Sequence, residues 1–171
     1  IKNPRTPLFY LLPKIHKVNN PGRPVVSSVS CHTESISRFV DRYLQSLVKQ
    51  LPSYIQDTTD FLLKLNNLPD KLPNDAFLVT LDVKSLYTNI PNDEGIEAVK
   101  FYLRSSEHRD LSQAIVAFLR LILSLNNFQF NDENYIQLNG VSMGTKCAPT
   151  YANLFMGYFE YRNILPLINE L

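Results

Sequence analysis

The spacing of apolar residues changes along the chain and separates predicted helices from predicted strands. Between residues 33 and 51 they recur every three to four positions, which is typical of a helix with one buried face. Thr33 or Ser35 would cap its start and Pro52 ends it. The apolar positions of this face are Ile36, Phe39, Val40, Tyr43, Leu44, Leu47 and Val48. Further helices are predicted over residues 57–68, 92–105, 110–124 and 150–164, and the first two helices are interpreted as core scaffolding.

Two hairpins are predicted from short apolar stretches around turn residues. Leu8–Leu12 and Arg23–Ser27 flank a turn at Asn19–Gly22. Phe128–Phe130 and Tyr135–Leu138 alternate in polarity around residues 131–134, which is a second hairpin pattern.

Residues 78–91 contain the most suggestive chemistry in the chain. The apolar run that starts at Leu78 predicts a buried strand, with Asp82 at its end and Tyr87 five residues later. A carboxylate at the tip of a core strand is well placed to hold a divalent cation against a phosphate. The tyrosine ring would line the same pocket, and Pro91 ends the segment.

Charge is unevenly distributed, although the net charge of the 171 residues is only +1. Residues 1–50 contain eight Lys or Arg against two acids, and the remainder contains nine against fourteen. This asymmetry favours an anionic ligand such as nucleic acid or a nucleotide, or else it is a chance surface bias. With 44% hydrophobic residues the chain can bury a core of one domain or one and a half, which argues against disorder.

The first predicted hairpin places Lys14, Lys17 and Arg23 near its tip with no acid among them. Such a cluster could clamp a triphosphate, or it could be an ordinary solvated basic turn. His16 lies between the lysines, and neither it nor His32 or His108 has a partner at metal-ligand spacing.

Residues 140–149 form a glycine-containing turn before a predicted helix. Gly140 and Gly144 would let the backbone approach a ligand closely, and Pro149 suits the first turn of a helix. Such a turn can receive an anion or stack against a base pair, although many similar turns are only tight connections.

Other features suggest where the protein works. Cys31 and Cys147 are far apart and match no metal spacing, which favours a reducing compartment. No apolar run is long enough to cross a bilayer and no signal peptide is visible, so we expect an intracellular protein with no membrane partner. The chain opens at Ile1, and we expect it to be an excised piece of a longer protein.

Four stretches, in order, carry a resemblance to a known family. They read LPKIHK at residues 12–17, GRPVVS at 22–27, LDVKSLYTNIP at 81–91 and GVSMGTKCAPTYANL at 140–154. Together they resemble the reverse transcriptases of Penelope-like retroelements over about residues 8–160. An unrelated α+β nucleotide-binding protein would have to match all four by coincidence.

The resemblance implies roles for residues in the fingers and the palm. Arg23 matches the fingers arginine that holds the incoming triphosphate, and Lys14 or Lys17 would be the accompanying lysine. Asp82 matches the first catalytic aspartate and metal ligand, and Val83 would offer its backbone carbonyl to the metal. Tyr87 matches the aromatic residue that selects deoxynucleotides, although it could also be a core aromatic.

The last stretch implies contacts around the nascent base pair. Met143 stands where many related polymerases have glutamine, and Gly144 begins the loop beneath the base pair. Both are therefore expected at the nucleotide. Lys146, Pro149 and Asn153 are expected at the template and primer, and Lys146 could instead approach the triphosphate.

The resemblance also implies a fold and its division. We expect an α+β fold, with fingers over residues 1–75 and a partial palm over 76–171, built on an antiparallel sheet backed by helices. The family carries paired aspartates in a Tyr-x-Asp-Asp turn and a thumb, but the only acids after Pro149 are Glu160 and Glu170. We expect the chain to stop before both features, and to be inactive alone.

The implied function is RNA-directed DNA polymerisation by a retrotransposon protein, through two-metal nucleotidyl transfer. The implied cofactor is Mg²⁺, with Mn²⁺ as a substitute, and the partners are an RNA template, a DNA primer and dNTPs. The expected location is the nucleus of a eukaryotic host. The alternative is a catalytically dead retroelement remnant that acts as a nucleic-acid-binding or interaction module. The residues do not determine the oligomeric state.

Overall fold

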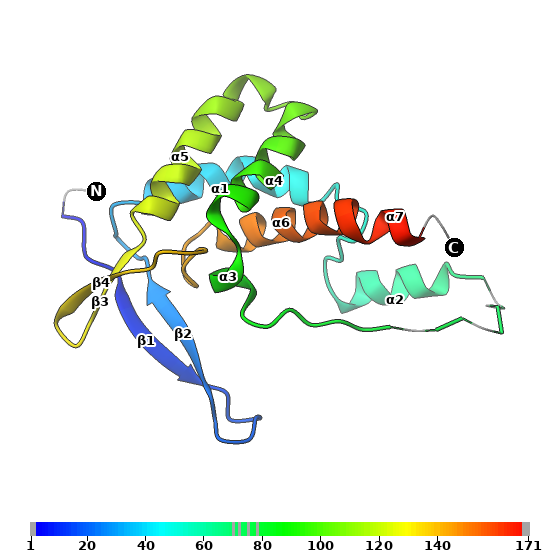
Figure 1. Cartoon of the computed structure of the whole chain (residues 1–171), viewed down its shortest axis with the longest axis horizontal. Coiled ribbons are helices and arrows are strands. Elements are labelled where there is room, and N and C mark those ends of the chain that lie inside the picture. The colour runs from blue at the N-terminus through cyan, green and yellow to red at the C-terminus, as the bar shows by residue number, and fades with distance from the viewer. Residues whose placement is uncertain (1–2, 70, 72, 75, 78, 169–171) are drawn as a thin grey trace.

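The computed structural model describes residues 3–69, 71, 73–74, 76–77 and 79–168, and shows an α+β fold (Figure 1). The helices gather in one body, and the first hairpin projects away from it. The elements are β1 (Leu8–Pro13), β2 (Gly22–Ser27), α1 (Glu34–Val48), α2 (Thr58–Asn66), α3 (Leu86–Asn89), α4 (Asn92–Arg104), a 3₁₀ turn (Arg109–Leu111), α5 (Ser112–Ser124), β3 (Asn127–Phe130), β4 (Glu133–Ile136), α6 (Ala148–Asn163) and α7 (Leu165–Ile168). Among the described residues, no helix is both long enough and apolar enough to cross a membrane.

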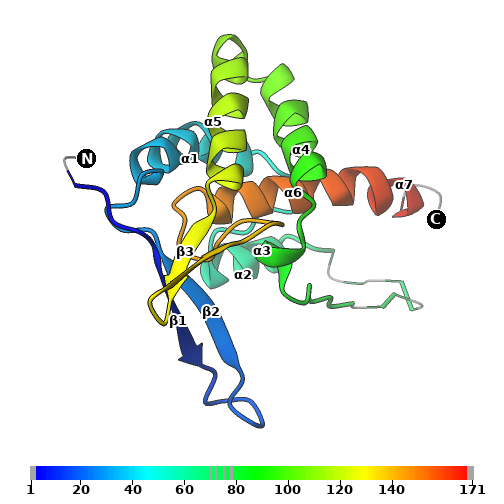
Figure 2. The ribbon, with the colours of Figure 1, turned by 60° about the vertical axis from the view of Figure 1, so that its left-hand side comes forward.

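Four helices enclose the main core (Figure 2). Helices α1 and α4 each pack against both α5 and α6, so their apolar faces meet. Val40, Leu44, Val99, Leu119 and Leu154 are fully buried there. The predicted face of α1 is confirmed, because its apolar positions are buried or pack against this core.

The sheet is mixed, which corrects the expectation of an antiparallel sheet. Its strand order is β2-β1-β3-β4, and both hairpins are antiparallel as predicted. β3 runs parallel to β1 through the pairing of Leu8 with Gln129. Two strands can be parallel only when a long connection returns the chain to the same starting end, and the helices between β2 and β3 provide it.

The second hairpin turns more tightly than expected. Asn131 and Asp132 alone form its turn, with φ of 51° and 61°. A two-residue turn with positive φ at both positions matches the twist of paired strands, and Asn and Asp tolerate it. Glu133 and Asn134, predicted in the turn, therefore belong to β4.

Helix α2 is not core scaffolding, which corrects that expectation. None of its residues is buried, and Leu62 and Leu63 are exposed. It is held locally, because the Asp57 carboxylate accepts a hydrogen bond of 2.9 Å from the Asp60 N–H. This is an ordinary N-terminal cap, so the predicted helix forms without joining the core.

The predicted strand before Asp82 is also wrong in the residues that can be described. Leu78 lies outside them, and residues 79–83 have no regular structure. Val79 is 71% exposed and Leu81 is 86% exposed. A buried strand needs a neighbouring strand and an apolar face to cover it, and the described residues supply neither at this position.

Candidate functional site

Residues 140–145 form the loop that joins the predicted site regions, and we call it the glycine loop. Its two glycines both have positive φ, 68° at Gly140 and 129° at Gly144. A Cβ atom at Gly140 would lie 2.1 Å from the Tyr87 carbonyl oxygen, and one at Gly144 would lie 2.1 Å from the Val26 carbonyl oxygen. Any side chain would therefore collide with rigid backbone on both sides, so the close approach requires glycine.

One end of the glycine loop is fastened to the segment that carries Tyr87. The Val141 N–H donates to the Tyr87 carbonyl at 2.9 Å. The Gly140 N–H donates to Asn92 Oδ1 at 3.0 Å, and Asn92 Nδ2 donates to the Leu138 carbonyl at 3.3 Å. These bonds fix the position of Tyr87 relative to the loop.

The other end is fastened to strand β2. The Val26 N–H donates to the Met143 carbonyl at 2.8 Å. The Ser28 hydroxyl donates to the Gly144 carbonyl at 2.5 Å. Arg23 lies in the same strand, so the glycine loop connects the strand of Arg23 to the helix of Tyr87.

Buried polar groups hold the middle of the glycine loop. Asn126 is 7% exposed, and its Nδ2 donates to the Gly140 carbonyl at 3.2 Å. The Ser142 hydroxyl, which is also buried, contacts Asn126 Oδ1 and lies 3.1 Å from Gln137 Oε1. Buried polar groups that satisfy one another resist displacement, because breaking one bond leaves its partner unsatisfied.

Tyr87 lies in the short helix α3 directly after a sharp change in direction. Ser85 has a left-handed conformation with φ of 53°, which starts the turn. The Tyr87 side chain is half-buried and packs against the main core. Its backbone is therefore anchored, and part of its ring faces solvent.

Asp82 and Val83 lie in the extended segment before this turn, and both are exposed. Within the described residues, Asp82 has no hydrogen bond or ion pair to the hairpin or to the glycine loop. In that part of the chain, no three His, Cys, Asp or Glu side chains group as metal ligands would. A carboxylate and a backbone carbonyl are oxygen ligands that suit Mg²⁺, but they make only part of a coordination shell.

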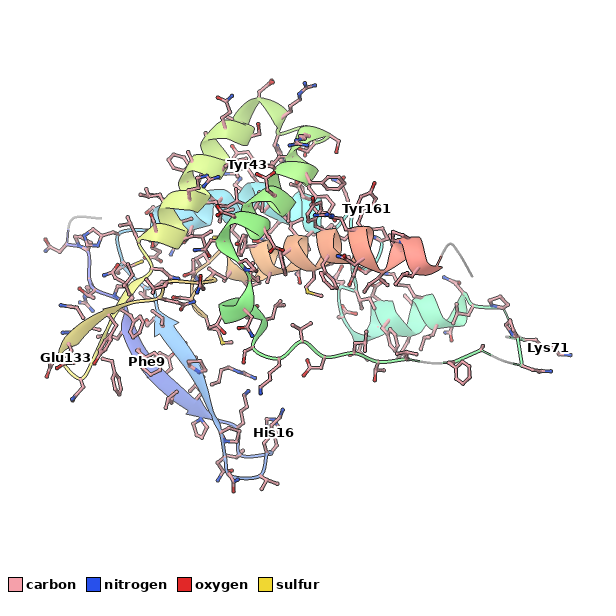
Figure 3. The ribbon with its side chains drawn as sticks, in the orientation of Figure 1. Phe9, His16, Tyr43, Lys71, Glu133 and Tyr161 are labelled. Atoms are coloured by element: carbon pink, nitrogen blue, oxygen red, sulfur yellow. The ribbon has the colours of Figure 1, made fainter. Side chains whose placement is uncertain are left out.

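The predicted cations lie on the projecting hairpin. Figure 3 shows His16 at its tip, farther from the helical body than Phe9. Lys17 and Arg23 are exposed, and Lys14 is half-buried. Across the ranges that the structure describes, none of these three cations pairs with a carboxylate, so their charge is available to a ligand.

The residues predicted to contact nucleic acid flank the start of α6. Lys146, Pro149 and Asn153 are all exposed. The pKa of the Glu34 carboxyl is lowered mainly because the Ser30 N–H donates to it, and Lys146 adds a smaller charge effect. Lys146 thus lies near an acid on α1.

A pocket of about 270 Å³ lies beside the glycine loop. Phe9, Val26 and Phe128 line it from the sheet, and Thr88 of α3 and Met143 of the glycine loop also line it. Its aromatic wall was missed by the sequence analysis, because separate strands contribute Phe9 and Phe128. The alternating polarity of both hairpins was the available signal, but it does not reveal which strands pair.

Asn92 and Asn126 were also missed as parts of the site. Asn92 is readable in sequence only as the first residue of a helix. Asn126 follows α5 without any distinguishing pattern. Their long-range hydrogen bonds to residues 138 and 140 appear only once the chain is folded.

Comparison with known proteins gives one family. The model of the family described as reverse transcriptase (RNA-dependent DNA polymerase) matches residues 15–164. The matched range includes Arg23, Asp82, Tyr87 and the glycine loop. No curated protein matches the chain.

Proposed function

Because the chain belongs to the reverse transcriptase family, we propose that it forms the fingers and part of the palm of a retrotransposon RNA-directed DNA polymerase of Penelope-like type. The observation that carries this proposal is the glycine loop, which is hydrogen-bonded to β2 on one side and to the Tyr87 segment on the other. The family acts on nucleic acid and generally uses Mg²⁺. Mn²⁺ would substitute for it.

We also propose a division of the chain into two regions. Residues 1–75 would be the fingers, with the basic hairpin reaching toward the nucleotide, and 76–171 would be the partial palm. In both ribbon views the hairpin and the segment that leads into α3 lie below helices α4, α5 and α6 (Figures 1 and 2). A nucleotide on that side would meet both the cations and Asp82.

The hairpin cations would bind the incoming triphosphate. Arg23 would contact phosphate oxygens through its planar guanidinium, accompanied by Lys14 or Lys17. All three have no carboxylate partner among the described residues, which leaves their charge for phosphate.

Tyr87 would select the sugar. A ring packed beneath the deoxyribose leaves no room for a 2′-hydroxyl, so ribonucleotides are excluded by contact. Met143 and Gly144 would lie beneath the nascent base pair. Lys146, Pro149 and Asn153 would contact the template and the primer.

Asp82 and the Val83 carbonyl would be ligands for Mg²⁺, which when bound stabilises the attacking and leaving oxygens. A site that holds two metal ions needs several carboxylates. Among the described residues, no three His, Cys, Asp or Glu side chains group as metal ligands would, around Asp82 or elsewhere. We therefore infer that further carboxylates must join Asp82 before the site can polymerise nucleotide.

The test is primer extension on an RNA template with dNTPs, using the protein expressed from its complete reading frame. Asp82→Asn should abolish extension, because the amide cannot supply the negative charge that holds the metal. Asp110→Asn is the matched control, because Asp110 is an exposed acid in the 3₁₀ turn after α4. Equal extension by wild type and Asp82→Asn would refute the catalytic assignment.

A second candidate function is a nucleic-acid-binding module derived from a decayed retroelement. The exposure of Asp82 favours it, because in the described residues Asp82 belongs to no group of three metal-ligating side chains. This candidate predicts that the protein binds RNA or DNA but extends no primer, with or without Asp82. Expression in a eukaryotic host with a fluorescent tag would test the proposed nuclear location.

A further inference from the structure

The side chain of Asn92 makes contacts that its position in a helix does not explain. Asn92 is the first residue of α4 and follows Pro91, which occupies the N-cap position and has no side-chain group that could cap the helix. No side-chain cap is present at this end. Instead, the amide bonds to Gly140 and Leu138, which lie 48 and 46 residues away in sequence.

Both polar atoms of this amide bond to the backbone where the chain enters the glycine loop. Oδ1 accepts from the Gly140 N–H at 3.0 Å, and Nδ2 donates to the Leu138 carbonyl at 3.3 Å. Asn92 is therefore hydrogen-bonded to the backbone on both sides of Asn139. This pattern imitates the paired hydrogen bonds of a neighbouring strand, because a carboxamide has an acceptor oxygen and a donor nitrogen side by side.

The backbone that Asn92 binds, at residues 138–140, continues directly into the residue that bonds to Tyr87. The next residue, Val141, donates to the Tyr87 carbonyl at 2.9 Å, and the Gly140 backbone packs against the same carbonyl. Asn92 is five residues after Tyr87 and is linked to it through α3 and Pro91. The chain therefore closes a loop, from Tyr87 through Asn92 to Gly140 and back to Tyr87.

We propose that Asn92 is a positioning residue for sugar selection, which holds Tyr87 at a fixed height relative to Met143 and Gly144. This inference rests on the proposed role of Tyr87. Without the Asn92 amide, the glycine loop keeps its bonds to β2, to Asn126 and to the Tyr87 carbonyl, but it loses its side-chain bonds to α4, so a single backbone bond holds it against Tyr87. The distance between the Tyr87 ring and residues Met143 and Gly144 then varies. A nucleotide with a 2′-hydroxyl can be accommodated when this distance increases.

The test measures the ratio of dNTP to NTP incorporation during primer extension by the protein from its complete reading frame. A ratio is used because it does not depend on the fraction of protein that is folded. Asn92→Ala should lower the preference for dNTP by about three- to tenfold, the equivalent of one to two lost hydrogen bonds. The KM for NTP should fall relative to that for dNTP.

Two further variants separate positioning from stability. Asn92→Asp keeps the acceptor for the Gly140 N–H and loses the donor to Leu138, so its ratio should lie between wild type and Asn92→Ala. Asn163→Ala removes an exposed amide whose Nδ2 donates to the Phe159 carbonyl at 2.9 Å within α6. Its ratio should equal that of wild type.

The outcomes distinguish this inference from the proposed function. Absence of extension by wild type would overturn the proposed function and the inference together. Extension with an unchanged ratio in Tyr87→Ala would remove the sugar gate on which the inference rests. A lowered ratio in Tyr87→Ala but not in Asn92→Ala would overturn the inference alone, even if Asn92→Ala lowered the melting temperature.

Discussion

The glycine loop and the extended segment at residues 79–83 contain the two strongest motifs of the chain, yet their structures are opposite. Val141, Ser142 and Thr145 are buried, and backbone bonds join the loop to β2 and to α3. In the extended segment every described residue is exposed. The difference teaches that a motif can position itself only when the residues around it supply partners.

The two regions also differ in what they would contribute to function. The glycine loop is fully held by hydrogen bonds, and it fixes the position of β2 relative to Tyr87. The extended segment offers one carboxylate whose position the described residues do not fix. Substitutions should therefore damage stability in the first region and chemistry in the second.

The largest expected effect is on chemistry. Asp82→Asn should reduce primer extension by the complete protein on the order of a thousandfold, because a metal ion supplies several kcal/mol of transition-state stabilisation. The free energy of unfolding should change by less than about 0.5 kcal/mol, because the side chain is exposed. Extension assays and urea denaturation of the same preparations measure both quantities. A large loss of stability would show that the segment is held more firmly than its exposure indicates.

The next largest effect is a loss of stability, and it tests how closely the glycine loop packs on β2. Gly144→Ala should destabilise the protein by about 3 kcal/mol, because its Cβ would lie 2.1 Å from the Val26 carbonyl oxygen at a φ of 129°. Gly22→Ala is the matched control. Its Cβ would approach no atom closer than 3.0 Å, and that atom is the flexible end of Leu11. Similar melting curves for the two variants would refute the close packing of the loop on β2.

A smaller effect is expected from the buried amide beneath the loop. Asn126→Ala should cost about 2 kcal/mol, because the Gly140 carbonyl and the Ser142 hydroxyl both lose a partner. Thermal unfolding measures this loss. Ser142→Ala together with Asn126→Ala should cost less than the sum of the two single changes, since both remove the same contact. Additive costs would show that the two side chains act independently.

How much could be predicted from the sequence depended on whether a pattern was local. Helix α1 and the hairpin β1–β2 follow from spacing and turn residues within one short stretch, and both are confirmed. The parallel pairing of β1 with β3 was not predictable, because it joins residues 8 and 129. Asn92 belonged to a correctly predicted helix, but the direction of its side chain depends on the glycine loop.

The apolar run before Asp82 shows that a local pattern can also predict an element that does not form. Its composition indicates a strand, and local composition alone cannot supply a second strand to pair with it. Leu81 is therefore 86% exposed although it matches a buried pattern. Met143 and Gly144 were predicted at the nucleotide from the family resemblance, and that role stays a prediction. Their fastening to β2 is a finding of the structure.

The smallest expected effect sharpens the contrast between the regions. Leu81→Ala should change the free energy of unfolding by less than about 0.5 kcal/mol, because a side chain that is 86% exposed buries almost no apolar surface. Leu119→Ala, at a fully buried position in α5, should cost about 2–5 kcal/mol for the same chemical change. Urea denaturation of the 171-residue chain measures both. Repeating Leu81→Ala in the complete protein extends the test, because a cost that appears only there would mean that Leu81 is buried against a partner outside the described residues.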